Sequence, residues 1–114
     1  LIDIYGERPL AQHPIYSMAK AALGMMTMAL AKDLGPDIRV NGIAPGAVLW
    51  PESGKAETER RELLARTPLG RAGEPGDLAR TALFLVRDAP YVTGQIIRVD
   101  GGVSAGLNWP IPLE

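Results

Sequence analysis

One long segment of the chain carries apolar residues at steps of three and four positions, which is the spacing of a helix with one buried face. The predicted buried positions are Ile15, Met18, Ala19, Ala22, Leu23, Met26, Ala29, Leu30 and Leu34. The pattern stops at Gly35 and Pro36, because glycine favours the position just after a helix and proline cannot continue one. The sequence therefore predicts a helix over residues 14–34.

Shorter patterns predict three strands and two further helices. Residues 1–4 alternate around an acidic position, while residues 38–43 and 95–99 are rich in branched apolar side chains. The segment 55–67 is dense in opposite charges and predicts a solvated helix over a pocket, and a stronger helix begins at Pro75. The predicted buried face of this last helix is Leu78, Ala79, Ala82, Leu83 and Val86. The alternation implies parallel strands joined by crossover helices, an α/β sheet.

Charge and composition exclude several classes of function. The chain has 114 residues, with 12 Lys and Arg against 13 Asp and Glu, so its formal net charge of -1 suits neither nucleic acid nor an anionic membrane. With no Cys and one His, a zinc or iron site is unattractive, and we expect no metal. The longest apolar stretch, residues 21–31, is too short to span a bilayer. The chain starts at Leu1 as if cut, without a signal peptide, and we expect a cytoplasmic protein.

Tyr16 and Lys20 are the candidate chemical pair of the long helix. They lie four positions apart and therefore project from the same side of the helix, one turn from each other. A phenol has an ordinary pKa of about 10, and an ammonium one turn away favours the phenolate. The pair therefore predicts a tyrosine that exchanges a proton closer to neutral pH.

Five short motifs occur in order along the chain, at compatible spacing. They are Tyr16-Ser17-Met18-Ala19-Lys20, Arg39-Val40-Asn41, Pro45-Gly46, Thr93-Gly94 and Val99-Asp100-Gly101-Gly102. Together they resemble the C-terminal half of the short-chain dehydrogenase/reductases, over residues 1–106. The resemblance implies the C-terminal portion of a doubly wound parallel sheet, a Rossmann fold, followed by a tail over residues 107–114.

Asp3 stands at the strand end where that superfamily usually carries a catalytic serine. It precedes Tyr16 by thirteen positions, and residues 7–10 follow it with Glu-Arg-Pro-Leu. In residues 45–52, Trp50 occupies the place of the threonine in the more common P-G-x-x-x-T pattern. These features resemble the pteridine reductases.

The resemblance implies hydride transfer from a reduced nicotinamide cofactor to a pterin, such as dihydrobiopterin or a dihydrofolate-like compound. Tyr16 would protonate the ring atom beside the carbon that receives the hydride. Lys20 would hold the nicotinamide ribose and lower the pKa of the tyrosine. Asp3 would orient the pterin or serve as a second proton donor.

The loop after the second predicted strand would complete the site. By the same resemblance, Pro45, Gly46, Ala47 and Val48 would clamp the carboxamide of the nicotinamide ring, with Tyr16 and Lys20 on the ribose. Leu49 and Trp50 would line the pterin pocket beside Asp3 and Tyr16. The usual donor of this family is NADPH, and these residues do not distinguish it from NADH.

The resemblance covers only the half of the family's domain that follows the phosphate loop. The chain holds no glycine-rich strand-to-helix loop for a pyrophosphate, and a complete dinucleotide fold needs about twice this length. We therefore expect part of a longer enzyme, inactive by itself. The resemblance also suggests a homotetramer built partly on helix 14–34, where Ala21, Met25 and Met28 form a second face.

Two alternatives stay open at this stage. One is a carbonyl reductase resembling the 3-oxoacyl carrier-protein reductases, although Asp3 in place of serine argues against it, because serine polarises a carbonyl without carrying charge. The other is a non-catalytic fragment that persists as an assembly module, which the missing phosphate loop favours.

Overall fold

The computed structural model describes residues 1–6, 11–46, 48 and 56–105. In chain order the elements are a 3₁₀ turn η1 (Ile4–Gly6), helix α1 (Pro14–Leu34), strand β1 (Gly42–Pro45), helix α2 (Ala56–Ala65), helix α3 (Pro75–Leu83), a π-helical turn η2 (Phe84–Asp88), strand β2 (Ile96–Val99) and a 3₁₀ turn η3 (Val103–Ala105). This is the predicted α/β order, and the fold class is confirmed by β1 and β2, which pair in parallel from Gly42 opposite Ile96 to Pro45 opposite Val99.

The first predicted strand is largely replaced by a turn. The Ile2 amide donates to the Ile43 carbonyl at 2.7 Å, so the chain starts beside β1 as a strand would. The Gly6 amide then donates to the Asp3 carbonyl at 2.9 Å and closes η1. The chain leaves the strand direction at Asp3 because this local bond replaces the next bond of a ladder.

Before β1 begins, its segment is joined to the segment before β2 by side chains and by one backbone bond, from the Gly94 amide to the Val40 carbonyl at 2.8 Å. The Val40 amide donates to Thr93 Oγ1 at 3.1 Å, and Asn41 Nδ2 donates to the Val92 carbonyl at 2.9 Å. Asn41 Oδ1 also accepts from the Gln95 amide at 3.1 Å. Residues 40–41 and 92–95 are therefore already joined before the regular pairing starts at Gly42.

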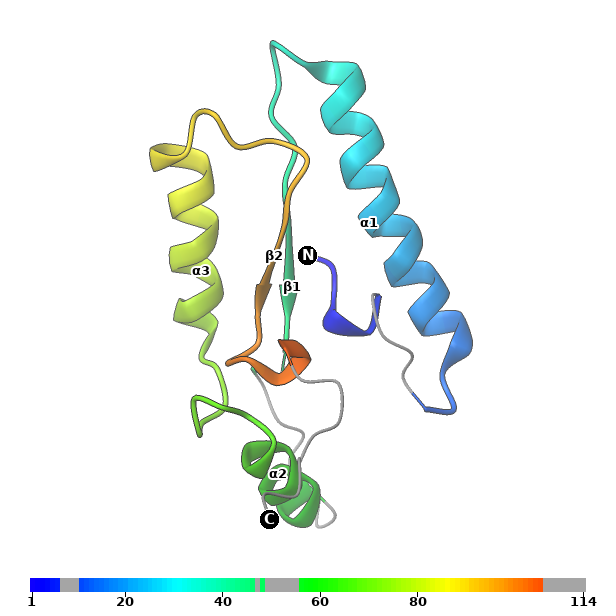
Figure 1. The fold of residues 1–114 in the computed structure, drawn as a ribbon, viewed down its shortest axis with the longest axis vertical. Helices are drawn as coiled ribbons and strands as arrows, with labels where there is room; N and C mark the ends of the chain where they lie inside the picture. Colours follow the sequence, from blue (N-terminus) through cyan, green and yellow to red (C-terminus); the bar gives the residue numbers. More distant parts are fainter. Residues whose placement is uncertain (7–10, 47, 49–55, 106–114) are drawn as a thin grey trace.

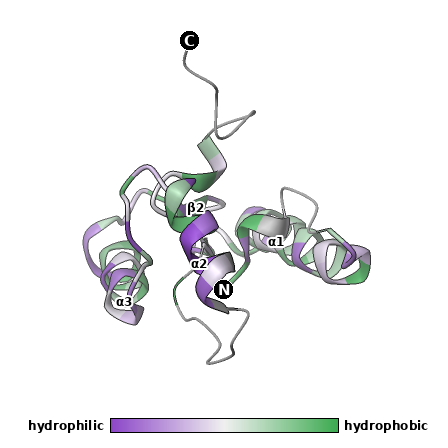
Figure 2. Ribbon diagram, turned by 90° about the horizontal axis from the view of Figure 1, so that it is seen from below, coloured by the Kyte–Doolittle hydropathy of each residue, from purple (hydrophilic) through white to green (hydrophobic). Residues whose placement is uncertain are grey.

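The helices lie on the two faces of the strand pair. Figure 1 shows α1 on one side of β1 and β2 and α3 on the other, and the view from below in Figure 2 agrees. The core lies between α1, η1 and the strands, and consists of Ile2, Ile4 and Ala44 with the partly buried Leu23, Ile96 and Val103 around them. This is the layer order of a doubly wound α/β fold.

The predicted buried face of α1 is wrong, although its bounds are confirmed. The buried positions are Gly24, Thr27 and Ala31, while most of the large apolar residues are exposed, Met18 by 62%. Of the nine predicted positions, Leu23 alone is half-buried, and the other eight are exposed: Ile15, Met18, Ala19, Ala22, Met26, Ala29, Leu30 and Leu34. The reason is close packing on β2, since a Cβ on Gly24 would lie 3.3 Å from Ile96 Cδ1.

α3 begins at Pro75 as predicted, but its buried face is also shifted. Leu78 and Ala82 are half-buried, whereas Leu85 is the buried residue of the segment. The other predicted positions, Ala79, Leu83 and Val86, are exposed. The helix widens into η2 after Leu83, and a π-helical turn changes the phase of the side chains that follow it. No helix in the described parts of the chain is long and apolar enough to cross a membrane.

Candidate functional site

The predicted functional residues gather at one end of the molecule. The carboxyl ends of β1 and β2, the start of α1, the turns η1 and η3, and α2 lie together at the lower end of Figure 1. In α/β sheets the carboxyl ends of parallel strands are where ligands bind. η1 packs on both α1 and β1 and so connects the helix to the strand end.

The structure brings Asp3, Tyr16 and Lys20 together. The Tyr16 hydroxyl donates to Asp3 Oδ2 at 2.6 Å, which is short, as expected for a bond to a charged acceptor. Lys20 Nζ lies 5.8 Å from the centroid of the Tyr16 ring. Tyr16 is 40% exposed, so a ligand can reach this side chain. A carboxylate, a phenol and an ammonium therefore share one small region.

Gly6 permits this arrangement, although no pattern in the sequence indicated a role for this residue. A Cβ on Gly6 would lie 2.9 Å from the Lys20 carbonyl carbon and 3.0 Å from Lys20 Cβ. Any side chain there would push η1 away from α1, because real Cβ atoms do not approach so closely. A single glycine in a predicted loop carries no special signal, so the sequence did not reveal its role.

The electrostatics of Tyr16 differ from the prediction. The hydrogen bond to Asp3, then burial, then the charge of Asp3 raise the pKa of Tyr16 to about 12. The prediction that Tyr16 exchanges a proton closer to neutral pH is wrong for this state, because the adjacent carboxylate stabilises the protonated phenol. The Tyr16 phenol therefore keeps its proton at neutral pH.

The predicted cofactor loop is described in part. Pro45 ends β1, and the Gly46 amide donates to the Val99 carbonyl at 3.0 Å. Pro45, Gly46 and Val48 are half-buried at this strand end. The predicted residues Ala47, Leu49 and Trp50 lie outside the described residues, as does the tail over residues 107–114.

A tight turn after β2 supports this loop. A Cβ on Gly46 would lie 2.8 Å from Asp100 Cβ, so the glycine is required by the close approach of the two strand ends. The Asp100 carboxylate accepts hydrogen bonds from the Gly102 amide at 2.9 Å, the Ser104 amide at 3.1 Å and the Ser104 hydroxyl. Burial by itself would raise the pKa of Asp100, but these bonds outweigh it and lower the pKa. Asp100 is therefore an ionised residue that holds the turn.

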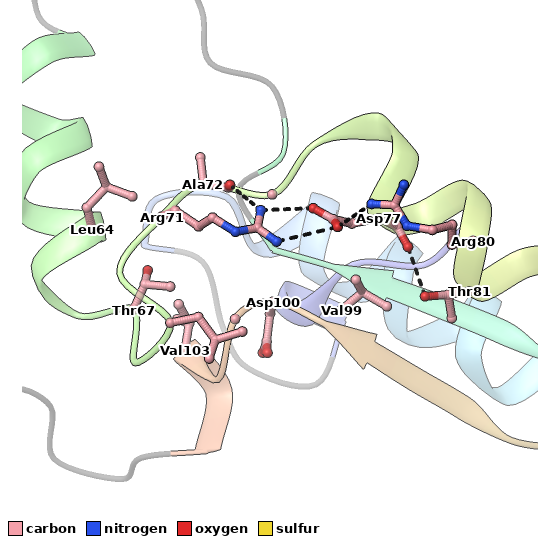
Figure 3. Close-up of a pocket in the computed structure, with 13 residues that line it drawn as sticks. Leu64, Thr67, Arg71, Ala72, Asp77, Arg80, Thr81, Val99, Asp100 and Val103 are labelled. Atoms are coloured by element: carbon pink, nitrogen blue, oxygen red, sulfur yellow. Dashed lines mark hydrogen bonds and ion pairs between the residues drawn. The ribbon is translucent and has the colours of Figure 1, made fainter.

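A cavity of about 330 Å³ lies between α2, the start of α3 and the end of β2 (Figure 3). Leu64, Val99 and Val103 contribute apolar walls. Arg71 Nη1 lies 3.0 Å from Asp77 Oδ2, and Arg80 Nη2 lies 2.9 Å from Asp77 Oδ1. Hydrogen bonds to Asp77 hold the pKa of its carboxyl well below its usual range. In order of decreasing effect, they come from the Arg71 guanidinium, the Glu74 amide and the Arg80 guanidinium. Arg71, Asp77 and Arg80 are thus paired with one another.

Comparison with known proteins agrees with this geometry. The family model described as enoyl-(acyl carrier protein) reductase matches residues 2–104. The 3-oxoacyl-[acyl-carrier-protein] reductase FabG of Thermotoga maritima is 46% identical over 106 residues, which cover 90% of this chain and 42% of that protein.

Solved structures show the same likeness. The short-chain dehydrogenase of Leptospira borgpetersenii with bound NAD⁺ superposes with a TM-score of 0.81 at 34% identity, covering 90% of this chain and 42% of that one. A small-chain dehydrogenase in complex with NADPH superposes with a TM-score of 0.82 at 30% identity, covering 92% of this chain and 49% of that one. The chain therefore spans less than half the length of each of these relatives.

Proposed function

The chain belongs to the short-chain dehydrogenase/reductase superfamily, and from this premise we propose that the full-length protein reduces a pterin with a nicotinamide cofactor. The observation that carries the proposal is the 2.6 Å hydrogen bond between the Tyr16 hydroxyl and Asp3. A carboxylate can accept hydrogen bonds from the amino and ring N–H groups of a pterin, whereas it would repel the oxygen of a substrate carbonyl.

The described residues fit the nicotinamide half of such a cofactor. The Tyr16 hydroxyl and the Lys20 ammonium supply hydrogen-bond donors for ribose hydroxyls, and the half-buried backbone of Pro45, Gly46 and Val48 can face a carboxamide. The cofactor would supply the hydride. NADPH is our first choice, because it is the usual donor of the pteridine reductases, and NADH is the second. Of the solved relatives, one holds NADPH and another holds NAD⁺. In the described parts of the chain, no three His, Cys, Asp or Glu side chains gather in a way that could hold a metal ion.

Tyr16 and Asp3 would divide the proton chemistry between them. With Asp3 bonded to Tyr16, the pKa of Tyr16 is about 12 and the proton is held firmly. A pterin whose N–H groups bond to Asp3 would compete for that carboxylate and so weaken the main cause of the raised pKa. Tyr16 would then release its proton more readily to the substrate, while Lys20 stabilises the phenolate that remains.

The experiment that tests this proposal is Asp3→Ser in the full-length protein, assayed with dihydrobiopterin and with a 3-oxoacyl thioester. We expect kcat/KM for the pterin to fall at least about a hundredfold, because a neutral hydroxyl does not replace a carboxylate facing N–H donors. Tyr16→Phe is the matched control, since it should lower kcat by about a hundredfold or more on any substrate with little loss of cofactor binding. Unchanged pterin turnover in Asp3→Ser would contradict the proposal.

A carbonyl reductase is the second candidate. It is favoured by the 46% identity to a 3-oxoacyl-[acyl-carrier-protein] reductase. Under this alternative, the wild-type protein reduces the 3-oxoacyl thioester and not dihydrobiopterin, and Asp3→Ser raises that activity. The two substrates in the same assay therefore separate the two functions.

We also propose that the full-length protein assembles as a homotetramer through α1. Ile15, Met18 and Met25 are 75%, 62% and 61% exposed and lie along the side of the helix that faces away from the strands. An apolar stripe of this kind on a single helix is typical of an interface.

A further inference from the structure

α2 stands apart from the rest of the described structure. It lies beyond the carboxyl ends of the strands, between the ends of α1 and α3 (Figures 1 and 2). Within the described residues it makes at most slight contact with any other helix or strand, and the 330 Å³ cavity separates it from α3 and β2. Among the described residues, the segment that leaves α2 is therefore its main connection to the rest of the structure.

That segment rests on the turn after β2. Thr67 lies two positions after the end of α2, where its amide donates to the Leu64 carbonyl at 3.1 Å and its hydroxyl to the Leu63 carbonyl at 2.7 Å. Two positions later, the Leu69 amide donates to the Gly101 carbonyl at 3.1 Å. Thr67 is 8% exposed, so the junction is buried although α2 itself is largely exposed.

The contact is too close for any residue but glycine. Gly101 has φ +64°, and a Cβ there would lie 2.7 Å from Thr67 Cγ2. Gly102 has φ +95°, and a Cβ there would lie 2.9 Å from Pro68 Cγ. Both backbone conformations and both contacts favour glycine. The Asp100 carboxylate holds this turn, and Asp100 is also the residue on which Gly46 packs.

We propose that the turn of Asp100, Gly101 and Gly102 sets the position of α2 relative to the strand end at Gly46, with Gly101 and Thr67 as positioning residues for the substrate side of the site. This rests on the proposed function and on the expectation from the sequence that the helix of residues 55–67 lies over the pocket, so that α2 covers the substrate while the Gly46 loop holds the cofactor. One turn then places both halves of the site. The Arg71–Asp77 ion pair ties the same segment to α3 further along the chain.

The test is Gly101→Ala in the full-length protein, alone and combined with Thr67→Ser. The added methyl group would push Thr67 and with it the end of α2, while Thr67→Ser removes the contacting Cγ2 and keeps the hydroxyl that bonds to Leu63. We expect KM to rise about tenfold or more in Gly101→Ala for whichever substrate the wild-type protein reduces, with kcat and the cofactor KM nearly unchanged. The double variant should recover most of the wild-type KM.

Gly94→Ala is the matched control. Gly94 has φ +72°, so alanine there meets the same backbone strain, but its Cβ would make an ordinary contact, 3.4 Å from Ala31 Cβ. Gly94 also lies before β2, at the opposite end of the strand from the site. We expect this variant to lose stability like Gly101→Ala while its KM stays at the wild-type value.

Hydrogen exchange provides a readout that does not depend on the identity of the substrate. The amides of α2 should exchange about tenfold faster in Gly101→Ala than in Gly94→Ala, and the double variant should restore their protection. If Gly101→Ala does not fold, Thr67→Ala in the otherwise wild-type protein removes the hydroxyl that bonds to the Leu63 carbonyl, adds no backbone strain, and should raise KM and α2 exchange in the same way. A Gly101→Ala protein whose KM and α2 exchange match those of Gly94→Ala would overturn the proposal, whatever the assays of Asp3→Ser show.

Discussion

Asp3 controls the protonation of Tyr16 more directly than Lys20 does. The carboxylate accepts a hydrogen bond from the Tyr16 hydroxyl at 2.6 Å, whereas the ammonium lies 5.8 Å from the ring centroid. The sequence predicted all three residues, Tyr16 and Lys20 from their helical spacing together with the family motifs, and Asp3 from the resemblance to the pteridine reductases. It did not predict the direction of the pKa, because that depends on which group reaches the hydroxyl.

The replacement Asp3→Asn should lower the pKa of Tyr16. An amide removes both the charge and the carboxylate hydrogen bond, so the pKa should move from about 12 toward the ordinary 10.0. The measurement is a pH titration of the tyrosine ring-carbon resonance by NMR, assigned with Tyr16→Phe. A pKa that stays near 12 in Asp3→Asn would show that burial, not Asp3, dominates.

The same shift fixes the sign of a pH effect on stability. Because folding raises the pKa of Tyr16, the Asp3–Tyr16 bond stabilises the folded state fully below pH 10 and loses this contribution as the pH rises from 10 to about 12. Asp77 behaves in the opposite sense, because its pKa is lowered, so its contribution is present above 3.8 and is lost as the pH falls below that value.

At the scale of elements, local sequence signals predicted the ends of the helices well and their buried faces poorly. Pro75 and Gly35 mark helix ends through their own backbone chemistry, and these ends were confirmed to within a residue or two. The buried face of α1 is the one that carries Gly24, where a Cβ would lie 3.3 Å from Ile96 Cδ1 of β2. Hydrophobic periodicity favours large residues for a buried face, so it selected the wrong side of the helix.

Arg39 holds the end of η2 in a way that no local pattern indicates. Its guanidinium donates to the carbonyls of Leu85 at 2.8 Å and Ala89 at 3.0 Å, and further to Val86 at 3.1 Å and Val92 at 3.4 Å. The end of a helical segment leaves carbonyls without partners, and a charged donor from another segment satisfies them.

The replacement Arg39→Ala should therefore destabilise the fold by roughly 2–4 kcal/mol, since it leaves several carbonyls poorly satisfied. Urea unfolding of the full-length protein measures this loss. Arg87→Ala is the control on the same turn, because Arg87 pairs at the surface with its neighbour Asp88 and should cost less than about 1 kcal/mol. Equal losses in the two variants would show that Arg39 is an ordinary surface residue.

At the scale of the whole molecule, the exposed side of α1 is the largest difference between the pattern and the structure. The pattern expected these apolar residues to be buried, and in the described structure they face outward. Both observations are explained if another copy of the protein covers these apolar residues. A pattern within one chain does not reveal such an interface.

Charged residues on that side should disrupt the assembly. We expect Met18→Glu with Met25→Glu to convert a tetramer into smaller species in sedimentation velocity at micromolar concentration, because each places a carboxylate in an apolar interface. Arg87→Gln, a change at an exposed position of η2, which continues α3 on the opposite face of the strands, should leave the tetramer intact. A wild-type protein that sediments as a stable monomer contradicts the assembly.

The parallel pairing of β1 and β2 also governs the order in which this region can fold. The Asn41 side chain meets the Gln95 amide across 54 positions, so the entropy of closing a long loop must be offset before the strands join. α1 and the Asp3–Tyr16 bond, by contrast, involve residues that lie close together in the sequence, 13 positions apart for the bond. During synthesis the edge of β1 therefore stays open until the last strand arrives, and an open strand edge is a site where chains aggregate.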